Sequence, residues 1–382
     1  FFFSQKQTKV SDIKVGIILG FTGPIESLTP DMASGAELAF KEATDSGELL
    51  GGANIIPVRA DSTCVDSAAA STAAEDLIAQ GIVAIMGADC SGVTGAIATN
   101  VAVPNGVVMV SPSATSPALT DLDDNGLFFR TAPSDARGGE VLADITKDNG
   151  VSSVAITYVN TDYGVGLADV YKAALEAHGI TVTTTTAHEG DKADYSAEVG
   201  VLSSAGGDAL AVLGYLDQGG NQIIQGSLDS GAFDTFVLSD GMIGDSLTDT
   251  FGSDLDKSFG SMPGSLGEGA QMFAKYAEEN GVNPSVYVGE SYDAAALIVL
   301  AMQAGESTDK SSIASNIMNV ANGPGEKIMA GELSKGLKLL ADGKSIDYQG
   351  ATDVSFTDVG EAFGLFIEKG IENGKFVNVS QR

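Results

Sequence analysis

Basic residues are scarce in this sequence, which has 20 Lys and Arg against 51 Asp and Glu and a net charge of -31. A surface of this sign repels the phosphates of nucleic acids and anionic lipids, so we expect no nucleic acid or membrane surface as a partner. The acidic residues are spread along the chain and form no acidic tail. We interpret them as a solubilising surface, with electrostatic steering of a ligand as the alternative.

Histidine is also scarce, with only His178 and His188 in the chain. Neither has a Cys or Ser beside it in a nucleophile motif. The sequence contains no H-E-x-x-H, C-x-x-C, G-x-S-x-G or Walker A pattern. We therefore expect no catalytic residues, no cofactor and no enzymatic activity.

Two motifs that carry chemistry elsewhere are incomplete here. Residues 121–126 (DLDDNG) resemble the first half of a calcium loop, but Ala132 stands where the closing bidentate carboxylate is needed. Residues 164–166 (GVG) resemble the start of a dinucleotide-binding loop that lacks its third glycine. We expect neither a metal site nor a nucleotide site.

Cysteine is limited to Cys64 and Cys90. Each follows a segment expected to be a strand, so the two could lie on neighbouring loops, and export would oxidise such a pair. From spacing alone, two inert core thiols remain the alternative. No apolar run approaches the ~20 residues needed to span a bilayer, so we expect no transmembrane segment.

The chain of 382 residues exceeds the usual size of one compact core, which favours two domains. From Lys14 onward, short apolar segments alternate with segments of helical periodicity. The first unit predicts strands at 14–19, 55–60, 83–87 and 107–111 and helices at 31–46, 66–80 and 91–103. The second predicts strands at 154–159, 181–187, 210–215 and 235–238 and helices at 137–149, 163–178, 195–204 and 220–228. Such alternation indicates parallel sheets with helices on both faces.

The last third of the chain departs from this alternation. It predicts helices at 267–280, 289–305 and 311–320, followed by strands at 351–356, 364–367 and 375–379. Extended segments near 128–133, 260–264 and 345–352 are expected to cross between two lobes as a hinge. We assign 12–130 plus 264–346 to an N-terminal lobe, 131–263 plus 347–382 to a C-terminal lobe, and 1–11 to an extension or processing remnant.

In the first unit, two strand ends lead into segments rich in small hydroxyl residues. Residues 89–92 (DCSG) follow the third strand, and residues 111–115 (SPSAT) follow the fourth. Ligands of open α/β folds bind at the carboxyl ends of the strands, where Ser91 and Thr115 offer hydroxyls. Free backbone N–H groups at helix starts favour a carboxylate. Ordinary helix capping by Ser and Thr is the alternative.

The second unit places larger side chains at the matching strand ends. Tyr163, Tyr215 and Asp240 each lie at or just after a predicted strand. Facing the first unit across a cleft, the tyrosine rings would cover an apolar ligand body and Asp240 would hold an ammonium. Alternatively, the tyrosines belong to a half-buried core and Asp240 caps a turn.

Several motifs together carry a family resemblance. They are residues 22–24 (TGP), the pair Cys64 and Cys90, and residues 111–117 (SPSATSP), 129–132 (FRTA), 162–166 (DYGVG) and 291–295 (SYDAA). With them the chain, from about residue 14 to about residue 379, resembles the type I periplasmic solute-binding proteins. Within these it resembles the leucine/isoleucine/valine-binding group, which serves branched-chain amino acid ABC transporters.

The resemblance implies an α/β fold of two similar lobes, each a parallel sheet flanked by helices, joined by a three-segment hinge. It implies a disulfide between Cys64 and Cys90. It also implies a ligand carboxylate near Ser91 and Thr115, and a ligand ammonium near the Ser113 carbonyl, the Thr115 hydroxyl and Asp240. The implied ligand-binding residues are Ser91, Ser113, Ala114, Thr115, Tyr163, Tyr215, Asp240 and Leu28.

Two positions depart from the family pattern. Asp240 stands where the family often has Glu, and Leu28 stands where it often has an aromatic residue. We therefore expect an amino acid or a related small amide as ligand, without naming a branched-chain amino acid.

The expected function is that of an exported, periplasmic and monomeric binding protein. It would close over its small-molecule ligand and deliver it to an ABC permease in the membrane. The alternative is a sensor of the same fold that signals to a separate membrane receptor.

Overall fold

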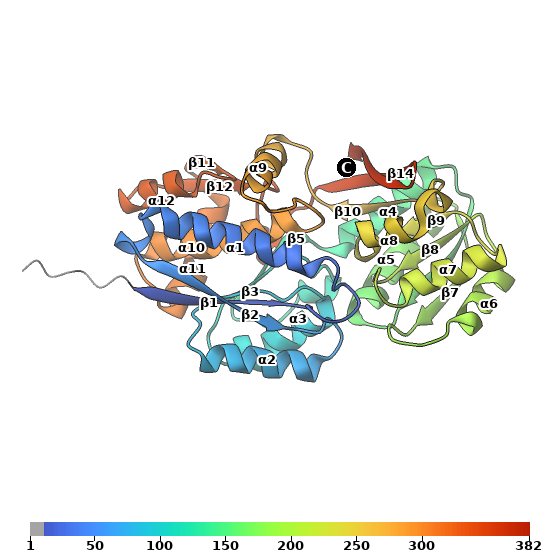
Figure 1. Cartoon of the computed structure of the whole chain (residues 1–382), viewed down its shortest axis with the longest axis horizontal. Helices are drawn as coiled ribbons and strands as arrows, with labels where there is room; N and C mark the ends of the chain where they lie inside the picture. Colours follow the sequence, from blue (N-terminus) through green and yellow to red (C-terminus); the bar gives the residue numbers. More distant parts are fainter. Residues whose placement is uncertain (1–10) are drawn as a thin grey trace, which may run out of the picture.

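The structure is a computed structural model, and it describes residues 11–382. The predicted extension over 1–11 lies outside the described residues, apart from Ser11. Two large sheets, each covered by helices, divide the described chain into two lobes that lie side by side in Figure 1. We call the lobe built on the sheet that contains β1 the first lobe, and the other the second lobe.

The sheet of the first lobe is entirely parallel, in the order β13-β5-β4-β3-β1-β2. Its strands are β1 (Asp12–Leu19), β2 (Asn54–Asp61), β3 (Ile85–Gly87), β4 (Met109–Ser111), β5 (Phe128–Pro133) and β13 (Glu361–Ala362). Its helices are α1 (Thr29–Ser46), α2 (Ser67–Ala79), α3 (Ser91–Ile97), α9 (Glu268–Glu279), α10 (Val288–Gly305), α11 (Lys310–Asn322) and α12 (Leu333–Ala341). A parallel pair, β11 (Glu326–Met329) and β12 (Ile346–Gly350), lies beside α12.

The sheet of the second lobe has the order β15-β14-β10-β9-β8-β6-β7. Its strands are β6 (Ser153–Val159), β7 (Thr181–His188), β8 (Ala209–Leu213), β9 (Phe236–Leu238), β10 (Phe259–Pro263), β14 (Phe366–Glu372) and β15 (Lys375–Gln381). Its helices are α4 (Asp135–Asp148), α5 (Asp162–Ala177), α6 (Ser196–Ala205), α7 (Gly220–Ser230) and α8 (Asp245–Phe251). Short turns of 3₁₀ or π helix are η1 (Leu49–Gly51), η2 (Ala98–Ala102), η3 (Pro117–Leu119), η4 (Asp240–Met242) and η5 (Gly252–Leu255).

The second sheet is not wholly parallel, which corrects the sequence-based expectation. β14 is antiparallel to β10, and β15 is antiparallel to β14. The two-residue connection Asn373-Gly374 explains the reversal from β14 to β15, because both residues have positive φ values, as two-residue hairpin turns require.

The chain passes between the two sheets in three places. The first passage follows β5, the second follows β10, and the third lies at residues 363–365, between β13 and β14. The third was expected near 345–352, but β12 there pairs with β11, and β13 still pairs with β5. The lobe limits stay a prediction, and these pairings favour a boundary near residue 362 in place of 346.

The predicted strand over 351–356 is also absent. Residues at its start form a turn in which the backbone N–H groups of Ala351 and Thr352 donate to the Asp293 carboxylate, at 2.8 and 3.0 Å. Asp293 lies on α10, whose residues are buried almost all round. Burial on every side is typical of a central core helix, and α10 packs against α1, α11 and α12.

Side-chain caps define where several helices begin. Asp66 accepts a backbone N–H at the start of α2, Ser134 does so for α4, and Thr161 for α5. Such caps satisfy N–H groups that have no partner within the helix. No helix within residues 11–382 is long and apolar enough to cross a membrane.

Candidate functional site

A small cavity lies between the two lobes, at the carboxyl ends of β3, β6, β8 and β9. Its volume is about 20 Å³, roughly the room that one water molecule needs. Residues that line it come from both lobes: Ile25, Leu28, Met32, Asp89, Cys90, Ser91, Ser113 and Tyr287 from the first, and Tyr163, Tyr215, Asp240 and Gly241 from the second.

The first-lobe wall is tied together by a disulfide. Cys64 and Cys90 form this bond, as the resemblance implied, 26 residues apart in the sequence. Next to it, the buried carboxylate of Asp89 accepts the Gly20 backbone N–H at 2.6 Å and the Ser62 hydroxyl at 2.8 Å. These bonds hold three loops of the first sheet in one arrangement.

Ser91 connects two of the predicted loops. Its hydroxyl oxygen accepts the backbone N–H groups of Thr115 and Ser116, at 3.2 and 3.1 Å. It does not cap α3, whose N-cap residue is Cys90 with no side-chain hydrogen bond. For Ser91, the capping alternative is therefore wrong.

The loop after β4 contributes less to the cavity than expected. Ser113 lines the cavity and donates its hydroxyl to the Asp89 carbonyl at 3.0 Å. Ala114 and Thr115 are buried but are not among the lining residues. The Thr115 hydroxyl donates to the Asp135 carboxylate at 2.7 Å, so it is already engaged.

The second-lobe wall is formed by aromatic rings and one carboxylate. Tyr163 and Tyr215 stack with ring centroids 5.1 Å apart, and the Tyr163 hydroxyl donates to Asp240 at 2.5 Å. Asp240 does not cap η4, whose N-cap is Ser239. Gly241 permits the close packing here, because a Cβ on it would lie 2.3 Å from the Gly214 carbonyl oxygen.

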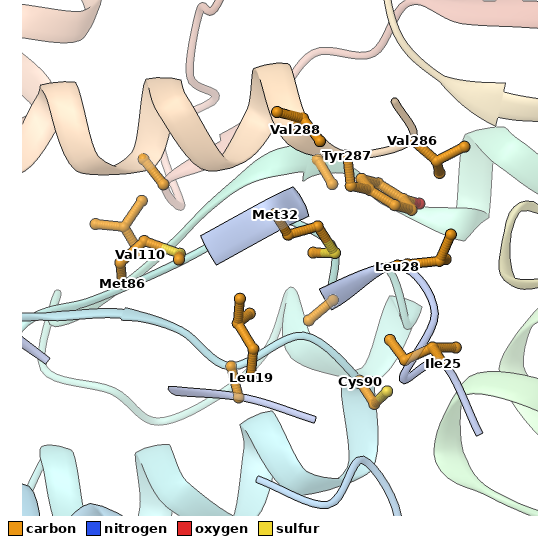
Figure 2. Close-up of a cluster of buried hydrophobic side chains, with 14 of the residues drawn as sticks. Leu19, Ile25, Leu28, Met32, Met86, Cys90, Val110, Val286, Tyr287 and Val288 are labelled. Atoms are coloured by element: carbon orange, nitrogen blue, oxygen red, sulfur yellow. The ribbon is translucent and has the colours of Figure 1, made fainter. Parts of the chain in front are cut away.

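Tyr287 joins the two walls and was not predicted from the sequence. It precedes α10 in the first lobe, and its hydroxyl donates to the Asp240 carboxylate of the second lobe. In Figure 2 the Tyr287 ring lies beside Met32 and Leu28, which form the apolar side of the cavity. Asp240 is thus bonded by one tyrosine from each lobe.

The cavity is strongly acidic. Burial raises the pKa of Asp240 and of Asp89. Burial, and then the neighbouring Asp240 charge, raise the pKa of Asp135 well above its ordinary value. Within the described part of the chain, no Lys, Arg or His lines the cavity. A ligand cation would offset the cost of burying these carboxylates.

The two lobes also contact each other at the cavity rim. The Ser27 backbone N–H donates to the Asp217 carboxylate at 2.9 Å, and the Asp217 backbone N–H donates to the Pro24 carbonyl at 3.0 Å. On the other side, the Ser116 hydroxyl donates to the Asp162 carbonyl at 3.5 Å. The described arrangement is therefore closed around the cavity.

Of the predicted ligand-binding residues, the structure brings six to the cavity and leaves two behind its wall. Those at the cavity are Leu28, Ser91, Ser113, Tyr163, Tyr215 and Asp240, and those behind it are Ala114 and Thr115. Their contact with a ligand stays a prediction. Asp89 lies two residues before Ser91 in the sequence and could have been suspected, whereas no strand end marks Tyr287.

Comparison with known families gives one match that covers most of the chain. The family model described as "Periplasmic binding protein" matches residues 12–329. Leu/Ile/Val-binding protein homolog 1 of Brucella melitensis is 30% identical over 313 residues, which cover 80% of this chain and 81% of that protein. Homolog 3 of the same organism is 35% identical over 214 residues, which span about half the length of each protein (55% and 56%).

Two solved structures share the fold. The leucine binding protein LivK from Thermotoga maritima has a TM-score of 0.80 at 22% identity, covering 97% of this chain and 98% of that one. The branched-chain amino acid transporter substrate binding protein LivJ from Streptococcus pneumoniae, in complex with isoleucine, has a TM-score of 0.78 at 20% identity, covering 97% and 100%.

Proposed function

This chain belongs to the periplasmic binding protein family, and on that premise we propose that it binds a small amino acid or related amide between its two lobes. The family consists of solute-binding proteins rather than enzymes, which confirms the predicted class of protein. The shared fold of the solved structures confirms the predicted two-lobed α/β architecture.

The observation that carries the proposal is the position of Asp240. It is a buried carboxylate that both lobes contact, in an acidic cavity to which no basic side chain of the described residues contributes. A ligand ammonium placed there would make charge-assisted hydrogen bonds, which are stronger than neutral ones. The Tyr163 and Tyr215 rings would cover the ligand body beside it.

The first-lobe wall suits the other end of a zwitterion. Ser91 and Ser113 place hydroxyl oxygens at the cavity. The Ser91 hydroxyl oxygen accepts two backbone N–H groups, which leaves its own hydrogen free to donate. A ligand carboxylate beside Ser91 would accept that hydrogen.

Opening of the lobes is required for this binding. A cavity of about 20 Å³ is too small for an amino acid. The closed walls meet through the hydrogen bond from Tyr287 to Asp240 and through the rim contacts. We propose that the lobes part by bending at the three passages, and that closure exchanges the Tyr287 bond for one from the ligand ammonium.

The experiment is a titration of the purified protein with the amino acids and small amides, followed by heat of binding and melting temperature. We expect saturable binding of at least one of them, with loss of binding in Asp240→Asn. Asp249→Asn, which changes an exposed carboxylate on α8, is the matched control. If no amino acid or amide binds, or if both variants bind as the wild type does, the proposed ligand class is wrong.

We further propose that the protein is an exported monomer and that a membrane ABC permease receives the ligand. The family match and the names of the relatives support this role. Capture of membrane proteins on the immobilised, ligand-loaded protein tests it. Recovery of a permease supports uptake, whereas recovery of a receptor kinase alone would support the sensor function instead.

A further inference from the structure

A second and larger cavity, which we call the hinge cavity, lies at the passages between the lobes and is not lined by Asp240. Its volume is about 230 Å³. Its walls include Thr131 and Pro133 from β5, Pro263 at the end of β10, and Phe363 from the third passage. All three passages thus contribute to one cavity, which has space for several water molecules or a ligand of a few heavy atoms.

Glu290 is a buried acid on the wall of this cavity. It lies in the first turn of α10 and is 5% exposed. Apart from its own backbone N–H, the Glu290 carboxylate has no hydrogen-bond or ion-pair partner within residues 11–382. Neighbouring polar groups are engaged elsewhere, since the Thr131 hydroxyl donates to the Glu290 backbone carbonyl and the Thr352 hydroxyl donates to Asp293. Burial removes most of the hydration of this carboxyl and raises its pKa to about 8, while the side chain still lines the cavity.

Once Glu290 is ionised, the charge of the cavity wall selects a cation. The only charged residues that line it, among those described, are Glu290 and Asp353. Asp353 accepts the Ser265 hydroxyl at 2.9 Å and has no basic partner in the described chain. Two carboxylates fall short of the oxygen-rich shell that calcium needs, and the described residues form no group of three or more potential metal ligands. A single positive charge therefore fits better than a divalent ion.

The aromatic residue at the rim favours the same ligand charge. Phe363 is 67% exposed although it lines the cavity. The face of a phenylalanine ring attracts cations within reach, most strongly where water is partly excluded. Phe363 thus adds a second group that a small ammonium can contact.

We propose that the hinge cavity is a second binding site, in which Glu290 holds a small monovalent cation, either an alkali metal ion or an alkylammonium. This second site goes beyond the proposed function, since it involves a different ligand and different residues. Because the walls come from all three passages, a bound cation would stabilise the arrangement of the lobes that presents Glu290 to it.

The test compares the melting temperatures of the wild type, Glu290→Gln and Glu75→Gln at constant ionic strength near pH 9. Burial raises the pKa of Glu290 to about 8, so this carboxyl is mostly ionised at pH 9. Sodium, potassium and methylammonium chloride are each exchanged against the chloride of the bulky cation N-methylglucamine. Glu75 is an exposed acid on α2, so its variant controls for the loss of one negative charge.

We expect at least one small cation to raise the melting temperature of the wild type and Glu75→Gln saturably, by about 2 °C or more. We expect no such rise in Glu290→Gln. A larger rise with sodium or potassium identifies the cation as an alkali metal ion, and a larger rise with methylammonium identifies it as an alkylammonium. An equal response of all three proteins, or no saturable response in any, would overturn the proposal.

If Glu290→Gln fails to fold, the pH dependence of the cation response of the wild type tests the proposal instead. The acids that face Glu290 are Asp293 on its own helix and Asp353 across the cavity. Protonation of Glu290 competes with the cation, so the stabilisation must weaken as pH falls from about 9 to about 7. A response that does not change over this range would overturn the site. Amino-acid binding is measured in a separate titration. Failure of the cation test therefore leaves the proposed function standing, and failure of the amino-acid titration leaves the cation site standing.

Discussion

The cavity around Asp240, which we call the ligand cavity after its proposed role, and the hinge cavity are both acidic, but their buried carboxyl groups have opposite surroundings. In the ligand cavity, Asp240 is bonded by Tyr163 and Tyr287, and the surrounding walls have closed to about 20 Å³. In the hinge cavity, Glu290 has no such partners and faces about 230 Å³. If both cavities bind ligands as proposed, a ligand of the first must displace hydrogen bonds already made, whereas a ligand of the second only has to enter.

The largest expected effect concerns the disulfide in the first-lobe wall of the ligand cavity, for which the lining of the hinge cavity has no counterpart. The Cys64–Cys90 bond closes a loop with a sequence separation of 26 residues, for which chain entropy predicts about 3–4 kcal/mol of stabilisation. The double variant Cys64→Ser/Cys90→Ser should lose this amount in the free energy of unfolding, measured with denaturant. The response to small cations at the hinge should be unaffected. A loss below about 1 kcal/mol would show that the hydrogen bonds of Asp89 suffice to hold the wall.

The second prediction separates the two carboxyl groups by their effect on ligand affinity. Asp240→Asn should weaken binding of the best amino acid by about 2–3 kcal/mol, or roughly 30- to 150-fold, because a buried ammonium loses its charged partner. Glu290→Gln should change that affinity less than about threefold at pH 7, where Glu290 is mostly protonated. Isothermal titration of both variants gives the ratio directly. Similar losses in the two variants would remove the distinction between the cavities.

The third prediction concerns the hydrogen bond that connects the walls of the ligand cavity. Tyr287→Phe removes the donation to Asp240 and should cost the closed, unliganded form about 1–2 kcal/mol relative to an open form. Small-angle scattering should then show a larger radius of gyration without ligand and the wild-type radius with it. Tyr158→Phe serves as the control, because Tyr158 lies on β6 and does not line the cavity. If neither variant expands, Tyr287 does not govern closure.

The smallest predicted effect is the pH dependence of the hinge cavity. Burial raises the pKa of Glu290 from its ordinary 4.5 to about 8. The folded chain keeps this proton in the window between those values while the unfolded chain releases it, so its stabilising contribution is lost as pH rises from about 4.5 to about 8. Relative to Glu290→Gln, the wild type should lose about 1 kcal/mol of unfolding free energy between pH 7 and pH 8. Parallel stability curves would mean that Glu290 is hydrated and titrates normally.

The sequence pattern was sufficient for most of the fold because local periodicity and parallel-sheet topology act together. Strand ends that lie far apart in the sequence meet at one edge of a sheet, which is why Tyr163, Tyr215 and Asp240 could be grouped in advance. The disulfide and the family came from motifs, and the structure and the family match confirm both.

The missed features depend on tertiary packing. Tyr287 has a left-handed backbone (φ 62°) and is brought to Asp240 only by the packing of α10. Thr115 lies behind the cavity wall, where its hydroxyl donates to Asp135 at the start of α4 in the other lobe, and its contact with a ligand stays a prediction. β13 has only two residues, too few for any periodicity, so the third passage was placed too early in the chain.

The most direct measurement of the central claim compares the best-binding amino acid with its deaminated carboxylic acid, in the wild type and in Asp240→Asn. If Asp240 holds the ligand ammonium, the wild type should prefer the amino acid by roughly 30-fold or more, and Asp240→Asn should lose most of that preference. If the wild type binds both compounds equally well, or if Asp240→Asn keeps the full preference, the ammonium is held elsewhere and the account of this cavity is contradicted.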